Sequence, residues 1–183
     1  RHSSLQWLHF LNVSSKILYN HTETSIKQNK RGSKWYGPID QYRSGLMNYV
    51  VHDRPVVISE SLFNRACDHG FNMANIVEDI WVDIHFIDEN GEGGGTIDTR
   101  QEEDAILIEI NKHQSVNNIL LTLFHEIKHV EQIANGDLKE NIYKGEDTKT
   151  YEYDARPHEQ DAWEFEKIAM ITFLELVGEM GNA

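Results

Sequence analysis

The chain has 183 residues, of which 39% are hydrophobic and 26% are charged, a composition typical of a globular domain rather than of a disordered or collagen-like chain. The 17 Lys and Arg residues against 30 Asp and Glu residues give a formal net charge of -13. This charge argues against a nucleic-acid-binding surface, because phosphate contacts need clustered cations.

Cysteine content and hydropathy indicate a cytoplasmic protein. The one cysteine, Cys67, excludes an internal disulfide framework and fits a reducing compartment. The longest apolar run, residues 119–124, is too short to span a bilayer, and no signal peptide is recognisable at the N-terminus. The chain begins with Arg1 rather than Met, so an earlier removal of a leader stays open. We expect neither a membrane nor a nucleic-acid partner, and the sequence does not define the oligomeric state.

The N-terminal third differs in pattern from the rest of the chain. Leucines and isoleucines recur near helical spacing over residues 4–19, which predicts a helix. Residues 20–38 are polar, basic and glycine-containing, which indicates a loop or linker. We therefore expect a helical extension and loop over residues 1–55, followed by the main domain over residues 56–183.

The main domain is predicted to open with a strand and a helix. Residues 55–58, Pro-Val-Val-Ile, are rich in β-branched side chains and predict a short strand. A helix capped by Ser59 or Ser61 follows and runs through Cys67, whose thiol we expect to lie in the core or to be half-buried.

Two further strands are predicted in the middle of the chain. Apolar and polar residues alternate over residues 81–87, the pattern of a half-buried strand, and His85 falls on its polar side, where we expect a surface histidine. Residues 90–95 are glycine-rich and predict a loop without the order of a phosphate-binding motif. Residues 105–110 are almost continuously apolar and predict a more fully buried strand.

Two long helices are predicted to close the chain. The first runs from about residue 115 to residue 135, with Gly136 at its C-terminal cap. The second runs from about residue 157 to residue 177, with Pro157 in its first turn and Gly178 ending it.

The first of these helices contains the motif His-Glu-Ile-Lys-His at residues 125–129. Because residues four apart share one face of a helix, the imidazoles of His125 and His129 can reach one metal ion. Zinc accepts imidazole nitrogen readily and leaves a position for water in hydrolytic sites. Glu126 stands beside the first ligand, where its carboxylate can take a proton from that water. The motif thus predicts a Zn²⁺ site with Glu126 as general base.

The second helix offers a third ligand within residues 156–163, where Glu159-Gln160-Asp161-Ala162 follows the ExxA pattern. HExxH followed by ExxA resembles the gluzincin metallopeptidases, and is most similar to the minimal zincin domains of the ImmA/IrrE type and their bacterial and phage-encoded relatives. The resemblance covers roughly residues 105–177. It implies that Glu159 is the third zinc ligand and that Ala162 lets the two helices approach closely.

The resemblance also implies an α+β, zincin-like fold, with a small mixed or antiparallel sheet packed beside the HExxH helix and the C-terminal ligand-bearing helix. Thermolysin-like gluzincins carry an Asp that supports the first histidine, but this chain has Trp163 at that position. Asp161 or Glu166 is a candidate to orient an imidazole instead.

The transition-state stabiliser is not identified by a motif. Tyr151, Tyr153 and His158 precede or begin the ligand helix, and a phenol can donate a hydrogen bond to a developing oxyanion. We expect an extended peptide to bind by strand addition to an edge strand, formed by residues 81–87 or 105–110. Residues 90–95 and 135–156 are candidate rims or lids of the cleft.

The predicted activity is zinc-dependent hydrolysis of peptide bonds in a peptide or protein substrate. One alternative is a catalytically inactive zincin-fold module that binds or regulates. Another is a deformylase-like or other non-peptidase zinc hydrolase, although the residues around Cys67 lack the glycine-cysteine signature of deformylases. A SprT-like protease is disfavoured by the net charge of -13 and by the absence of a zinc-ribbon cysteine set.

Overall fold

The computed structural model describes residues 40–44, 47–76, 80–88, 95–100 and 105–181, all within the unit Tyr36–Ala183. These residues form a mixed α and β structure with three α-helices, eight strands and two short 3₁₀ helices. The helices are α1 (Glu60–Met73), α2 (Val116–Ala134) and α3 (Pro157–Gly181), and the 3₁₀ helices are η1 (Thr148–Thr150) and η2 (Tyr153–Ala155). The strands are β1 (Asp40–Ser44), β2 (Met47–His52), β3 (Trp81–Ile87), β4 (Gly95–Arg100), β5 (Ala105–Asn111), β6 (Leu138–Lys139), β7 (Ile142–Tyr143) and β8 (Glu146–Asp147).

The larger sheet has five strands in the order β1-β2-β3-β5-β4. The three central strands, β2, β3 and β5, run parallel, and β1 and β4 pair antiparallel at the two edges. Helix α1 connects β2 to β3, which gives the chain the length it needs to return to the start of a parallel neighbour. The sheet is therefore mixed, one of the two forms expected, with a parallel centre.

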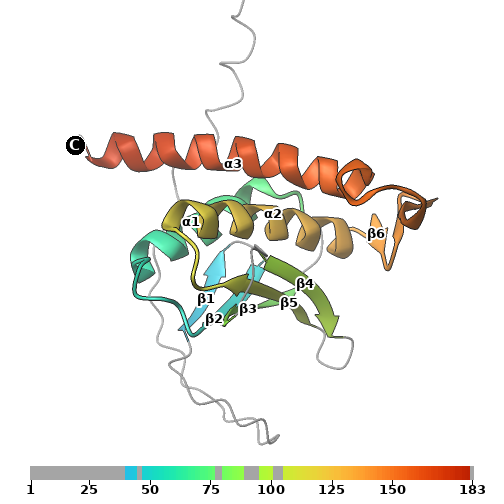
Figure 1. Cartoon of the computed structure of the whole chain (residues 1–183). Helices are drawn as coiled ribbons and strands as arrows, with labels where there is room; N and C mark the ends of the chain where they lie inside the picture. Colours follow the sequence, from blue (N-terminus) through green and yellow to red (C-terminus); the bar gives the residue numbers. More distant parts are fainter. Residues whose placement is uncertain (1–39, 45–46, 77–79, 89–94, 101–104, 182–183) are drawn as a thin grey trace, which may run out of the picture. The chain divides into compact units, whose positions relative to one another are not determined.

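The helices form two layers above one face of this sheet. Helices α1 and α2 cover the sheet, and α3 lies over α2 on the side away from it (Figure 1). The layers meet in a single hydrophobic core, in which Phe63 of α1, Phe124 of α2 and Phe173 of α3 are each fully buried. Burial of such a side chain contributes about 1.5–3 kcal/mol to folding.

Helix α2 is buried on two sides because the sheet lies below it and α3 above it. Ser115 caps its first turn by accepting a hydrogen bond from the N–H of Asn118 at 3.3 Å. Asn135 caps the other end, and Gly136 follows in the left-handed region with φ +73°. The predicted helix and its glycine stop are thus confirmed, and the polar side chains of His125, Glu126 and His129 in the middle of α2 are buried.

The connection from α2 to α3 is more ordered than a loop. Strands β6, β7 and β8 form a small antiparallel sheet, and η1 and η2 lead from it into α3. Within it, Tyr143 is nearly buried and reaches back toward α3, where its hydroxyl donates to Asp161 at 3.0 Å. This small sheet is therefore held against the start of α3.

The prediction of a strand at residues 55–58 is wrong, because these residues form a turn. The N–H of Ile58 donates to the carbonyl of Pro55 at 3.3 Å, which closes a turn, and Val56 is fully exposed. Helix α1 then begins after its cap Ser59 and continues past the predicted end at Cys67 to Met73, since its apolar stripe continues through Phe71.

The predicted strands at residues 81–87 and 105–110 are confirmed as β3 and β5, but neither lies at an edge of the sheet. The edges are β1 and β4. Strand β4 was not predicted from the sequence, in which it follows the glycine-rich residues 90–95. His85 is only 9% exposed, so the expectation of a surface histidine is also wrong. Gly178 does not end α3, which continues to Gly181.

The sheet extends upstream of the boundary expected at residue 56, because β1 and β2 belong to it. The predictions for residues 4–19, 20–38 and 90–94 lie outside the described residues. Cys67 is fully buried in the core, as expected. Among the described helices, none combines the length and the apolar run that crossing a membrane requires.

Candidate metal centre

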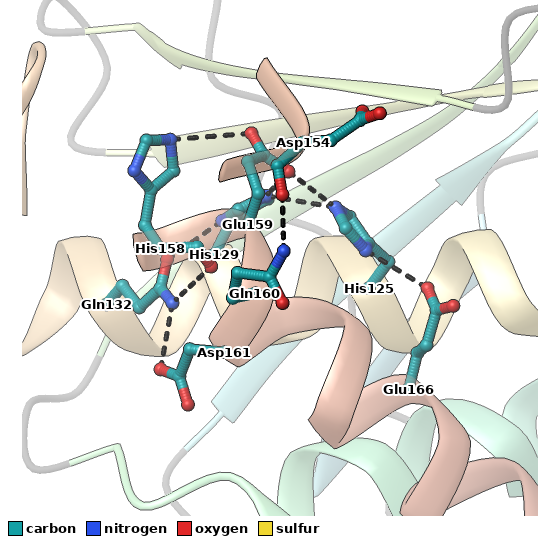
Figure 2. Close-up of polar contacts among 9 residues, drawn as sticks. All are labelled: His125, His129, Gln132, Asp154, His158, Glu159, Gln160, Asp161 and Glu166. Atoms are coloured by element: carbon teal, nitrogen blue, oxygen red, sulfur yellow. Dashed lines mark hydrogen bonds and ion pairs between the residues drawn. The ribbon is translucent and has the colours of Figure 1, made fainter. Parts of the chain in front are cut away.

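The predicted ligands meet where α2 passes under the first turn of α3 (Figure 2). One turn of α2 places His125 and His129 on the same face, with their Nε2 atoms 3.1 Å apart. Glu159, in the first turn of α3, places Oε2 at 3.2 Å from Nε2 of His125 and 3.4 Å from Nε2 of His129. All three side chains are nearly buried, so their donor atoms face one another rather than bulk solvent.

The three donor atoms form an almost equilateral triangle with edges of 3.1–3.4 Å. A tetrahedral zinc ion with bonds of about 2.0–2.1 Å to nitrogen and oxygen separates its ligand atoms by about 3.3 Å. The spacing of the three donor atoms therefore matches that of three ligands of such an ion.

Gln132 determines which nitrogen of His129 faces the cluster. Its amide nitrogen donates to the carbonyl of His158 and to a carboxylate oxygen of Asp161, both at 3.0 Å. Since neither partner can donate, the amide oxygen must face Nδ1 of His129, 2.8 Å away. Nδ1 then carries the proton, and the Nε2 lone pair of His129 is directed at the cluster.

Glu166 acts in the same way on the other histidine. Its Oε2 lies 3.0 Å from Nδ1 of His125, on the side away from Glu159. A carboxylate accepts only, so Nδ1 of His125 is the protonated nitrogen and its Nε2 also faces the cluster. Of the two candidates to orient an imidazole, Glu166 thus contacts His125 directly, whereas Asp161 acts on His129 through Gln132.

Two nitrogen lone pairs and a carboxylate oxygen at these distances repel one another unless a cation lies between them. In the metal-free protein the cation is a proton. Burial opposes the charged imidazole of His125, but hydrogen bonds to Glu159 and Glu166 outweigh it and raise its pKa to about 9. Burial likewise opposes the charge of Glu159, yet the hydrogen bond from His125 and the charge of that imidazole hold its pKa well below the usual range. The cluster is therefore built to hold positive charge.

Glu126 lies next to His125 on α2 and is 5% exposed. Burial raises the pKa of its carboxyl, although the nearby imidazoles of His129 and His125 oppose the shift. A raised pKa makes the carboxylate a stronger base than an exposed glutamate, which is the property that a general base needs.

A hydrogen-bonded chain, of which the sequence predicted only Asp161, supports the cluster. It runs from His129 through Gln132 to Asp161, which also accepts from the hydroxyl of Tyr143 and lies 3.5 Å from Nζ of Lys128. The one signal for Gln132 was its position three residues after His129, on the same helical face. No sequence signal places Tyr143 here, because it comes from the small sheet.

The three candidate stabilisers lie in different places. Tyr153, half-exposed, is next to the cluster: burial, the negative charge of Glu159 and the hydrogen bond that the phenol donates to Glu159 raise its pKa to about 12. His158 is buried with Nε2 at 3.4 Å from the other oxygen of Glu159, and its Nδ1 has no hydrogen-bond partner among the described residues. Tyr151 is instead hydrogen-bonded to Glu146 in β8, so it is not brought to the cluster.

The residues present therefore fit a divalent ion of the class that imidazole and carboxylate bind. Protein-family models, curated proteins and solved structures were compared with the chain, and none matches it. The chemistry of the centre thus rests on its own atoms: three converging donors, two oriented imidazoles and an adjacent buried carboxylate.

Proposed function

We propose that this chain is a zinc-dependent metallopeptidase with a zincin-like fold. The observation that carries the proposal is the triangle of donor atoms from His125, His129 and Glu159, with edges of 3.1–3.4 Å. A structural zinc site has four protein ligands and needs no base, whereas this centre combines three ligands with the buried carboxylate of Glu126. That combination favours a hydrolytic site.

The arrangement of elements is consistent with this function. Buried strand β5 leads into α2, which carries the HExxH motif, and the small sheet β6-β7-β8 leads into α3, which carries Glu159. Ala162 of α3 is fully buried one turn after Glu159, and its small side chain permits the close approach of α2 and α3 that the three-ligand site requires.

Zinc bound to these three residues would polarise the scissile carbonyl and lower the pKa of a bound water toward about 7. Glu126 accepts the proton from the attacking water and returns it to the leaving amine. Glu166 and Gln132 keep the two imidazoles in the tautomer that points Nε2 at the ion. Tyr153 keeps its proton across the physiological range and donates it in a hydrogen bond to the developing oxyanion.

The substrate class is an extended peptide or protein segment. Strand β4 is the edge of the sheet on the side of β5 and also contacts α2. An edge strand offers unpaired backbone groups that a peptide can use by strand addition. We therefore assign to β4 the role that residues 81–87 or 105–110 were expected to have.

The proposal is tested by mass spectrometry of a peptide mixture incubated with the zinc-loaded full chain. We expect cleavage that disappears with chelator and returns with zinc. Glu126→Gln keeps all three ligands and should bind zinc normally, while its turnover falls by about 10²–10⁴-fold. Undiminished cleavage by this variant would refute the mechanism, and an absence of cleavage by the native zinc-loaded chain would refute the activity.

A further inference from the structure

A second group of metal-ligating side chains lies away from the candidate metal centre, on β2 and β3. His52 is the last residue of β2, and Asp83 and His85 lie on β3. One donor atom from each of the three residues lies within 4.8 Å of the donor atoms of the other two. None of these residues belongs to the HExxH motif or contacts it through any interaction described above.

The register of two parallel strands brings these residues together. His52 is the register partner of His85, and their rings lie 4.1 Å apart between centroids. Asp83 precedes His85 by two residues, so both side chains project from the same face of the sheet. Glu109 of β5, the register partner of His85 on its other side, adds a second carboxylate to this face.

This face is the one that the helices do not cover. Val82, Ile84 and Phe86 alternate with Asp83 and His85 along β3, and all three belong to the core shared with α1 and α2. Because neighbouring residues of a strand point to opposite faces, Asp83 and His85 project away from the helices. The sheet thus separates this cluster from the centre between α2 and α3.

We propose that His52, Asp83 and His85 form a second metal site, which binds a divalent transition-metal ion and ties β2 to β3. Two imidazoles and one carboxylate are a donor set that zinc and its neighbours accept. His85 is nearly buried, while His52 and Asp83 are half-buried, so the ion enters from the side of these two residues and is partly removed from water.

The second site binds more weakly than the first. Two of its three ligands, His52 and Asp83, are half-buried, so their side chains lose more freedom on binding the ion and solvent competes for it. The donors between α2 and α3 already stand 3.1–3.4 Å apart. Since preorganisation raises affinity, zinc should fill the two sites as two distinguishable classes.

The test is equilibrium dialysis of the full chain against zinc, with bound metal determined by elemental analysis. We expect two zinc ions per native chain, one tight and one weaker. His52→Asn and Asp83→Asn should each lose the weaker ion and retain the tight one. His113→Asn is the matched control, because His113 also pairs with an acid, Asp88, at 2.7 Å on the surface, and it should keep both ions.

Glu159→Ala separates this proposal from the proposed function, because it removes a ligand of the first site only. It should retain the weaker ion, and zinc should raise its thermal midpoint; Glu159→Ala combined with His52→Asn should bind no ion and show no such rise. His85→Asn is a further variant. Because His85 is nearly buried, its substitution is more liable to disturb folding than substitution of the half-buried His52 or Asp83. A single class of zinc in the native chain, or two ions of unchanged affinity in both His52→Asn and Asp83→Asn, would overturn the second site.

Discussion

Gln132 offers the sharpest test of how the centre is organised. It is 1% exposed and makes three hydrogen bonds, to Nδ1 of His129, to the carbonyl of His158 and to Asp161. Gln132→Leu keeps a side chain of similar size but removes all three. The metal ligands themselves remain, so the variant isolates the effect of orienting His129.

Two consequences follow from the lost contacts. Loss of a partner that orients a metal ligand costs about 10–100-fold in metal affinity, which corresponds to about 1.4–2.8 kcal/mol. The carbonyl of His158, which lies within α3 and also accepts a helical hydrogen bond, loses its bond from Gln132, and a lost hydrogen bond costs about 0.5–1.5 kcal/mol of folding stability. Asp161 is less affected because it still accepts from Tyr143.

The assay is zinc competition with a chromophoric chelator at fixed pH, after circular dichroism has shown that the variant is folded. Gln160→Leu is the matched control, because Gln160 is exposed one residue after Glu159 and bonds only to the backbone of η2 in the described contacts. We expect the control to bind zinc within about twofold of the native chain. A folded Gln132→Leu variant with native zinc affinity would refute the assignment of the His129 tautomer.

Three other predictions concern catalysis, packing and pH. Tyr153→Phe should lower kcat for peptide cleavage by about 10²–10³-fold, while Tyr151→Phe, away from the cluster, leaves it within twofold; equal kcat values would contradict the oxyanion role. Phe173→Ala should cost about 3–5 kcal/mol in urea unfolding, against about 0.5 kcal/mol or less for the exposed Leu174→Ala on the same helix. In the metal-free protein, the raised pKa of His125 contributes stability that is complete below about pH 6.5 and is lost as the pH rises through about 9. The urea midpoint of the metal-free protein should therefore fall between pH 6.5 and about 9. A urea midpoint that does not change over this pH range would contradict the pairing of His125 with Glu159.

Much of the ligand geometry was predictable because it is local. The four-residue spacing of His125 and His129 places both imidazoles on one helical face whatever surrounds them. Glu159 was predicted from its pattern, and its approach to the histidines depends on how α3 packs on α2. Gln132 and Tyr143 carry no motif, and their roles arise from that packing and from the small sheet.

The strand errors have equally specific causes. Residues 56–58 are β-branched, but Pro55 opens a turn and Val56 has no sheet to pack against. Strand β4 follows a glycine-rich run and gains its hydrogen bonds from β5, a partner that its own sequence does not reveal. The same is true of His85: its burial depends on a register with β2 and β5 that no local pattern encodes.

Zinc content per chain tests the central claim most directly. It should be measured by elemental analysis of the full chain after dialysis that removes weakly bound metal. The native protein is compared with Glu126→Gln and Glu159→Ala, which change two buried glutamates of the same centre. The native protein and Glu126→Gln should each retain one zinc ion, and Glu159→Ala should retain none. A native protein without tightly bound zinc, or a Glu159→Ala variant that holds zinc as firmly as the native chain, would contradict the three-ligand centre.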